Sequence, residues 1–128
     1  MKVCDIVQFH SDLSGGVKRY LYDKVHYFAG RDDVEHVVVV PAVRDGQRHV
    51  EKTTICEIGS PPLPGSSSYR MLVSTRKILA VMERERPDII EVDSPYRSAW
   101  IGLNAGCSAN IPVVAFYHSD YPRAFGRT

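Results

Sequence analysis

Short apolar runs and longer amphipathic segments alternate along this chain, and the two patterns predict different elements. Apolar runs predict β-strands over residues 3–9, 34–41, 53–58, 88–92 and 111–117. Apolar residues that recur every three or four positions predict helices over residues 69–86 and 97–109, and another that begins at Val17. Strands that alternate with helices favour right-handed crossovers, so the expected class is α/β, a Rossmann-like open parallel sheet flanked by helices.

Glycine and proline residues predict where several of these elements end. Gly30 follows the apolar face of the first helix, and Pro87 stops the second. Asp45-Gly46 is a turn signal between segments of strand character, which predicts a small hairpin or strand pair that includes 53–58. Residues 59–68 are rich in proline, glycine and serine, which predicts a surface loop inside one domain.

Composition narrows the classes of function. The chain has 128 residues and a net charge of +1, from 16 basic and 15 acidic side chains, which argues against non-specific nucleic-acid binding. The three cysteines form no CxxC pair, and Cys4 and Cys56 lie in apolar runs typical of buried thiols. The sequence opens without a signal-peptide pattern and contains no apolar run long enough to span a membrane, so we expect a cytoplasmic setting.

The loop after the first predicted strand carries His10 and ends in Gly15 and Gly16, directly before a helix. Paired glycines leave backbone N–H groups uncovered at a positive helix end, which favours phosphate binding. The same pair also suits a turn that only lets strand and helix pack closely. The fingerprints GxGxxG and GxxxxGK[ST] are absent, which disfavours dinucleotide redox chemistry and NTP hydrolysis.

Two further polar loops follow predicted strands. Asp93 and Arg97 flank Pro95 in the first, where an acidic side chain can cap a helix and an arginine can simply be solvated. His118 and Asp120 follow the last strand, where they can orient a substrate hydroxyl or form hydrogen bonds at the sheet edge. A zinc site would need His10, His118 and a third ligand that the sequence does not specify, and no GxSxG elbow is present.

The segments FHSDLSGGVKRYL, RPDIIEVDSPYRSAWIG and IPVVAFYHSDYPR, in this order and spacing, resemble the amino-terminal domain of family 4 retaining glycosyltransferases of the GT-B fold. The resemblance implies two Rossmann-like domains around a cleft and a nucleotide-diphosphate sugar as donor, without a metal or other cofactor. It implies that Gly15 and Gly16 approach the donor diphosphate and that His118 is the catalytic residue beside the transferred sugar. The acceptor or sugar is then bound by His10, Asp93, Arg97 and Asp120.

We therefore expect residues 1–128 to form the acceptor-side domain of a glycosyltransferase, incomplete and inactive without a carboxyl-terminal donor-binding domain of the same chain. The expected partners are a nucleotide sugar, an acceptor hydroxyl compound and that missing domain, with no nucleic acid. A freestanding phospho-ligand-binding domain without catalysis is the alternative. The first helix carries positive charge from Lys18, Arg19 and Lys24. This charge indicates either peripheral contact with an anionic membrane or an ordinary solvated face.

Overall fold

The computed structural model describes residues 1–10, 16–62, 64, 65, 69–93 and 97–115, and only the backbone of residues 9, 10, 16–18, 97 and 98. Its helices are α1 (Gly16–Ala29), α2 (Thr75–Glu85) and α3 (Arg97–Ala109). A six-stranded sheet consists of β1 (Lys2–Ile6), β3 (Glu35–Ala42), β4 (Gly46–Val50), β5 (Thr53–Gly59), β7 (Ile89–Val92) and β8 (Val113–Ala115). A separate pair joins β2 (Phe9–His10) to β6 (Arg70–Met71).

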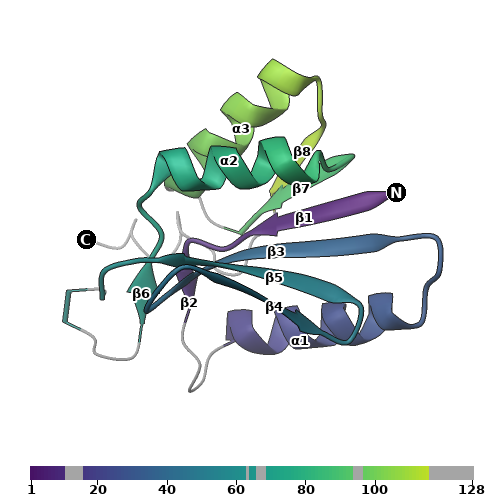
Figure 1. Cartoon of the computed structure of the whole chain (residues 1–128), viewed down its shortest axis with the longest axis horizontal. Helices are drawn as coiled ribbons and strands as arrows, with labels where there is room; N and C mark the ends of the chain where they lie inside the picture. Colours follow the sequence, from purple (N-terminus) through teal and green to yellow (C-terminus); the bar gives the residue numbers. More distant parts are fainter. Residues whose placement is uncertain (11–15, 63, 66–68, 94–96, 116–128) are drawn as a thin grey trace, which may run out of the picture.

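The large sheet has the strand order β4-β5-β3-β1-β7-β8, and among its described strands β4 alone runs antiparallel to its neighbour. Helix α1 covers one face, while α2 and α3 lie side by side over the other (Figure 1). From β1 the chain moves outward to β3 and β5, and it then returns past β1 to form β7 and β8. This Rossmann-like order reverses between β1 and β7, so the topological switch point lies between these two strands.

Two apolar clusters fill the spaces between the sheet and its helices. Alternate side chains of the central strand β3 enter one cluster or the other, whereas Cys4 and Ile6 of β1 both enter the cluster under α2 and α3. The cluster under α2 and α3 includes Cys4, Ile6, Val37, Val39, Leu72, Ile78 and Ile90. The smaller cluster under α1 consists of Val7, Leu21, Val38, Val40 and Ile55.

Helix α3 packs closely on the sheet through two glycines on its inner face. A Cβ atom at Gly102 would lie 2.8 Å from Cγ1 of Val92, and one at Gly106 would lie 2.4 Å from Cγ2 of Val113. Any side chain at these positions would therefore push the helix away from β7 and β8.

Several sequence predictions are confirmed. Helix α3 has the predicted bounds, α1 begins one residue before Val17 and ends just before Gly30, and β3 and β7 fall within one residue of the predicted runs. The thiols of Cys4 and Cys56 are buried and free, as their apolar surroundings indicated.

The first predicted strand, residues 3–9, is divided in two. Strand β1 ends at Ile6, and Phe9–His10 forms the short strand β2 against β6. Between them, Val7 N donates a hydrogen bond to Val39 O, whereas Leu72 N donates to Gln8 O. The chain thus leaves the large sheet at Gln8, because the backbone of that residue bonds to the link between β6 and α2.

The second predicted helix, residues 69–86, starts too early. Residues 70 and 71 form β6, and α2 begins only after Ser74, whose hydroxyl accepts a hydrogen bond from Lys77 N. Leu72 is fully buried but precedes the helix, whereas Leu79 lies on its exposed side. The apolar spacing therefore predicted too early a start for this helix, and the buried face of α2 consists of Ile78, Val81 and Met82.

Two strand predictions also need correction. The hairpin exists, but its two-residue turn is Glu51-Lys52, with Glu51 at φ 53°, while Asp45 lies in the link from β3 to β4. The run 111–117 was predicted to be a buried strand. Its described part, β8, is the edge strand, and Val114 is 43% exposed because α3 and β7 cover only part of it.

Candidate functional site

The carboxyl ends of β1 and β7 meet at the switch point, where open parallel sheets bind ligands. Gln8 lies two residues beyond β1, and Asp93 directly follows β7. Helix α1 begins at Gly16, after the loop that leaves β1, so its first backbone N–H groups are at this edge. The edge combines a positive helix end with a carboxylate, the groups that could bind an anionic sugar derivative.

Gln8 joins three segments around this point. Its backbone N donates a hydrogen bond to Oδ1 of Asp93 over 3.1 Å, which ties the end of β1 to the end of β7. Its side-chain Nε2 donates to the carbonyl oxygen of Leu72 over 2.8 Å, and its own carbonyl accepts from Leu72 N. Since Gln8 is only 3% exposed, these bonds satisfy polar groups that water cannot reach.

The predicted site residues divide between the described and the undescribed parts of the chain. Asp93 lies at the switch point, Gly16 starts α1, His10 ends β2 and Arg97 starts α3. For Arg97 and His10 the structure describes the backbone, which follows β7 and β1 at the carboxyl edge. The remaining three predicted residues lie outside the described residues; they are Gly15, His118 and Asp120.

A buried group of charged residues lies between α1 and the sheet, and we call it the α1 charge cluster. It consists of Asp5, Lys24, His36 and Glu91, with hydroxyl partners from Tyr20 and Thr53. Lys24 Nζ lies 2.8 Å from Oδ1 of Asp5 and 2.7 Å from Oε2 of Glu91. The His36 ring bonds to Oδ2 of Asp5 through Nε2 and to Oγ1 of Thr53 through Nδ1.

The two carboxyl groups of this cluster have opposite electrostatic behaviour. For Asp5, burial raises the pKa, but hydrogen bonds with His36 and Glu91 and the charge of Lys24 outweigh burial and lower the pKa to about 2. For Glu91, burial and the neighbouring Asp5 raise the pKa to about 7, against a smaller lowering by Lys24. Asp5 is thus the permanent anion, and Glu91 titrates near neutral pH.

The sequence pattern did not predict this cluster, and Lys24 was expected on a cationic outer face of the first helix. The structure corrects this interpretation for Lys24, whose side chain is 14% exposed and ion-paired inward, while Arg19 is exposed. A sequence signal did exist, because Asp5 and Glu91 interrupt strands that are otherwise apolar. Which distant charge would pair with them could not be read from that pattern.

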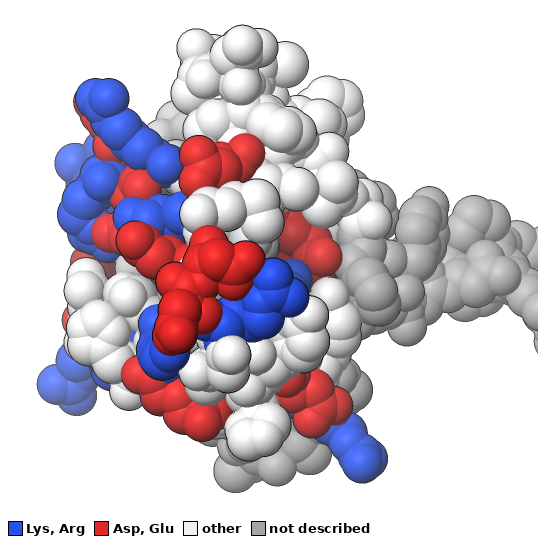
Figure 2. All heavy atoms as spheres, turned by 90° about the vertical axis from the view of Figure 1, so that its right-hand side faces the viewer, with Lys and Arg blue, Asp and Glu red and all other residues white. Residues whose placement is uncertain are grey.

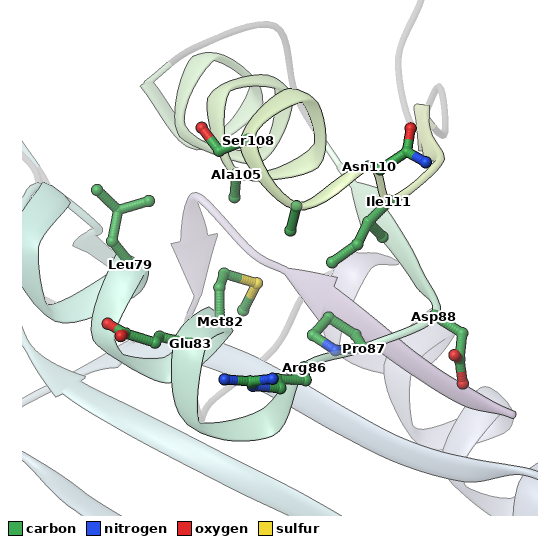
Figure 3. A pocket seen from close by; sticks show the side chains of 11 residues that line it. Leu79, Met82, Glu83, Arg86, Pro87, Asp88, Ala105, Ser108, Asn110 and Ile111 are labelled. Atoms are coloured by element: carbon green, nitrogen blue, oxygen red, sulfur yellow. The ribbon is translucent and has the colours of Figure 1, made fainter.

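A cavity among the described residues lies away from this edge. It has a volume of about 700 Å³ and lies between the carboxyl ends of α2 and α3 (Figure 3). Its lining includes Pro87 and Asp88 before β7 and Ile111 before β8, so it opens at the amino ends of the strands. Ligand binding at a switch point uses the opposite edge, and we do not assign this cavity to the site.

The amino edge of the sheet carries mixed charges that largely neutralise one another. Acidic and basic side chains intermingle there, and the surface above them, over α3, is uncharged (Figure 2). Ion pairs at this edge include Arg31–Asp33 at 2.8 Å and Lys52–Asp32 at 2.9 Å. Such exposed pairs favour solubility more than stability.

The described residues contain neither a metal-binding cluster nor a membrane-spanning helix. No cluster of three or more histidine, cysteine, aspartate or glutamate side chains has the geometry to hold a metal ion there. In the same part of the chain, no helix combines the length and apolar character that crossing a membrane requires.

A family model described as Glycosyltransferase Family 4 matches residues 14–128. The chain belongs to this family. The match includes Gly15, Gly16 and all of α1, β7 and α3, so it covers the start of α1 and the β7 side of the switch point, whereas β1 and Gln8 precede it. Among curated proteins, none matches the chain. Membership of this family supports a glycosyltransferase-type role, on an α/β sheet with Rossmann-like topology.

Proposed function

We propose that this chain forms the acceptor-side wall of a two-domain GT-B enzyme that transfers a hexosyl group from a nucleotide-diphosphate sugar to an acceptor hydroxyl. The observation that carries the proposal is the switch point, where Asp93 and the start of α1 follow the neighbouring parallel strands β7 and β1, and both Asp93 and the start of α1 lie within the family match. The helix start can stabilise negative charge on a departing diphosphate. Gly15 and Gly16 would allow the diphosphate to approach the backbone there.

The proposed chemistry is transfer with retention of configuration at the sugar carbon. His118 hydrogen-bonds the transferred sugar, and His10, Asp93, Arg97 and Asp120 bind the acceptor or the sugar. Correct placement of the acceptor hydroxyl against the departing phosphate lowers the barrier without a protein nucleophile. The proposal requires no metal or other cofactor and no nucleic acid. It places the reaction in the cytoplasm, with membrane contact open as a route to a lipid acceptor.

A transfer assay with the gene's complete reading frame tests these assignments, using UDP- and GDP-sugars as donors. Gly16→Val should raise the KM for the donor about tenfold or more, because a branched side chain blocks the approach to the helix start. His118→Ala should lower kcat by about 10²-fold, as expected for the loss of a group that supports the reacting centre. Matched controls are Gly46→Val and His49→Ala, both on exposed strand β4.

Unchanged kinetics in both Gly16→Val and His118→Ala would reject the assigned site. The anomeric configuration of the product, read by NMR, tests retention. Residues 1–128 alone should show no turnover, and measurable transfer by them would contradict the proposed two-domain arrangement. The alternative, a freestanding domain that binds a phosphorylated ligand without catalysis, is favoured if UDP or GDP binds but the complete reading frame transfers no sugar.

A further inference from the structure

The α1 charge cluster contains two carboxyl groups but a single ammonium group. Asp5 and Glu91 are register partners on the neighbouring strands β1 and β7, so their side chains leave the same face of the sheet at adjacent positions. Like charges placed opposite one another across two strands are destabilising. Lys24 bridges both carboxyl groups, but one ammonium ion balances only one of them when both are ionised.

Asp5 has a further partner, His36, whose hydrogen bond favours its ionised form. His36 contacts Asp5 through Nε2 and Thr53 through Nδ1, the latter over 2.9 Å. A neutral imidazole donates through one ring nitrogen and accepts through the other, so these two contacts need no second positive charge in the cluster. Tyr20 approaches Glu91 instead, with its hydroxyl 3.2 Å from Oε2.

Glu91 is the acid of the cluster with the best access to solvent. Its side chain is 16% exposed, compared with 4% for Asp5 and 1% for His36. A proton therefore enters or leaves the cluster most easily through Glu91. The groups that face it are Asp5 from β1 and both Lys24 and Tyr20 from α1, with His36 of β3 behind Asp5.

We propose that Glu91 is a proton-exchanging group whose ionisation weakens the pairing of β1 with β7 beneath the switch point. With Glu91 protonated, Asp5 and Lys24 form a balanced buried pair. With Glu91 ionised, two adjacent carboxylates share one cation, and the repulsion acts across β1 and β7. This inference goes beyond the proposed function and does not depend on it.

The direction with pH follows from linkage. The raised pKa of Glu91 means that the folded protein retains this proton to higher pH than the unfolded chain does. The favourable contribution is complete below the ordinary glutamate value of 4.5 and is lost as the pH rises through about 7. The fold should therefore be less stable at pH 8.5 than at pH 5.5, and the loss should be specific to Glu91.

Urea unfolding of the 128-residue chain at these two pH values tests the proposal with two variants. The midpoint of Glu91→Gln should exceed that of the wild type by a larger margin at pH 8.5 than at pH 5.5, because the amide cannot ionise. Glu57→Gln is the matched control, a half-buried glutamate on β5 that faces one cation, Arg48 at 3.6 Å. It should keep the pH dependence of the wild type. A margin for Glu91→Gln that does not change with pH overturns the proposal.

A second measurement uses the wild-type protein and therefore does not depend on the folding of a variant. Carboxyl carbon NMR of the wild-type protein labelled with ¹³C at glutamate follows the titration of Glu91 directly. Its midpoint should lie nearer 7 than 4.5. A midpoint at the ordinary glutamate value overturns the proposal even if the unfolding curves depend on pH for another reason.

Discussion

Asp5 carries a negative charge on β1, between the apolar residues Cys4 and Ile6. Its side chain is 4% exposed, yet its carboxylate is paired with Lys24 and with the imidazole of His36. A buried carboxylate is tolerated only when charges and hydrogen bonds replace the water it has lost. The same residue therefore holds α1 and β3 to β1, which an apolar side chain of similar size would not do.

Replacing Asp5 with asparagine should remove part of the loss of stability in acid. The pKa of Asp5 is lowered from 3.8 to about 2 in the folded protein, so its contribution is present above pH 4 and lost as the pH falls towards 2. Asp5→Asn should cost about 2 kcal/mol at pH 6, because an amide removes the charge of one of the two carboxyl partners of Lys24.

Urea unfolding between pH 2 and pH 6 measures this effect. The stability of Asp5→Asn should fall less steeply than that of the wild type between pH 4 and pH 2. Asp23→Asn, on the exposed side of α1, is the control and should follow the wild-type curve. An acid limb of equal steepness in Asp5→Asn would show that other carboxylates control unfolding in acid.

The close contact of helix backbone with the sheet positions the elements of this protein as much as the burial of apolar faces does. Helix α3 lies directly on β7 and β8 because Gly102 and Gly106 present no side chain to the sheet. At Gly106 an added Cβ would also lie 2.6 Å from the carbonyl oxygen of Ile111, in the link that leads into β8. Neither neighbour can move without shifting the backbone or the edge strand.

Gly106→Ala should therefore destabilise the fold by about 1–3 kcal/mol, although alanine is the better helix former. Thermal unfolding followed by circular dichroism measures the change. Gly46→Ala is the control, because a Cβ there would meet nothing closer than 3.6 Å, and its effect should be small. A Gly106→Ala variant as stable as the wild type would mean that α3 does not lie as close to β8 as described.

The predicted bounds of helices were most accurate where a residue that stops a helix directly followed the apolar face. Gly30 and Pro87 mark the ends of α1 and α2, and α3 was predicted residue for residue. The predicted start of the second helix was wrong because residues 70 and 71 form a strand that pairs with β2, which is far away in the sequence. The prediction of a buried strand over 111–117 was wrong for β8, which lies at the edge of the described sheet, because apolar composition does not tell how many neighbours a strand has.

At the scale of the whole molecule, the switch point joins the two halves of the sheet. The half with β3, β4 and β5 and the half with β7 and β8 meet only at β1 among the described strands. The location of a site at this edge could be predicted from strand–helix order, whereas the role of Gln8 could not. A single glutamine after a strand carries no signal until its partners, Asp93 and Leu72, are known.

Gln8→Leu should weaken the connection between these halves. The substitution removes the donor to the buried carbonyl of Leu72 and should cost about 2 kcal/mol, because an unsatisfied buried acceptor loses its solvation without compensation. Urea unfolding measures the loss, and Gln47→Leu on the exposed strand β4 is the matched control. Equal stability of both variants would indicate that water or another donor replaces the Gln8 amide.

The central position of β1 has a consequence for synthesis of the protein. Val3 pairs with Ile89, so the edge of β1 that faces β7 stays unpaired until β7 has been translated. The pairing of β4 with β5 and of β5 with β3 involves nearer neighbours and can form earlier. We therefore expect the nascent chain to present an apolar strand edge while translation continues, the kind of surface that chaperones cover and that aggregates when they do not.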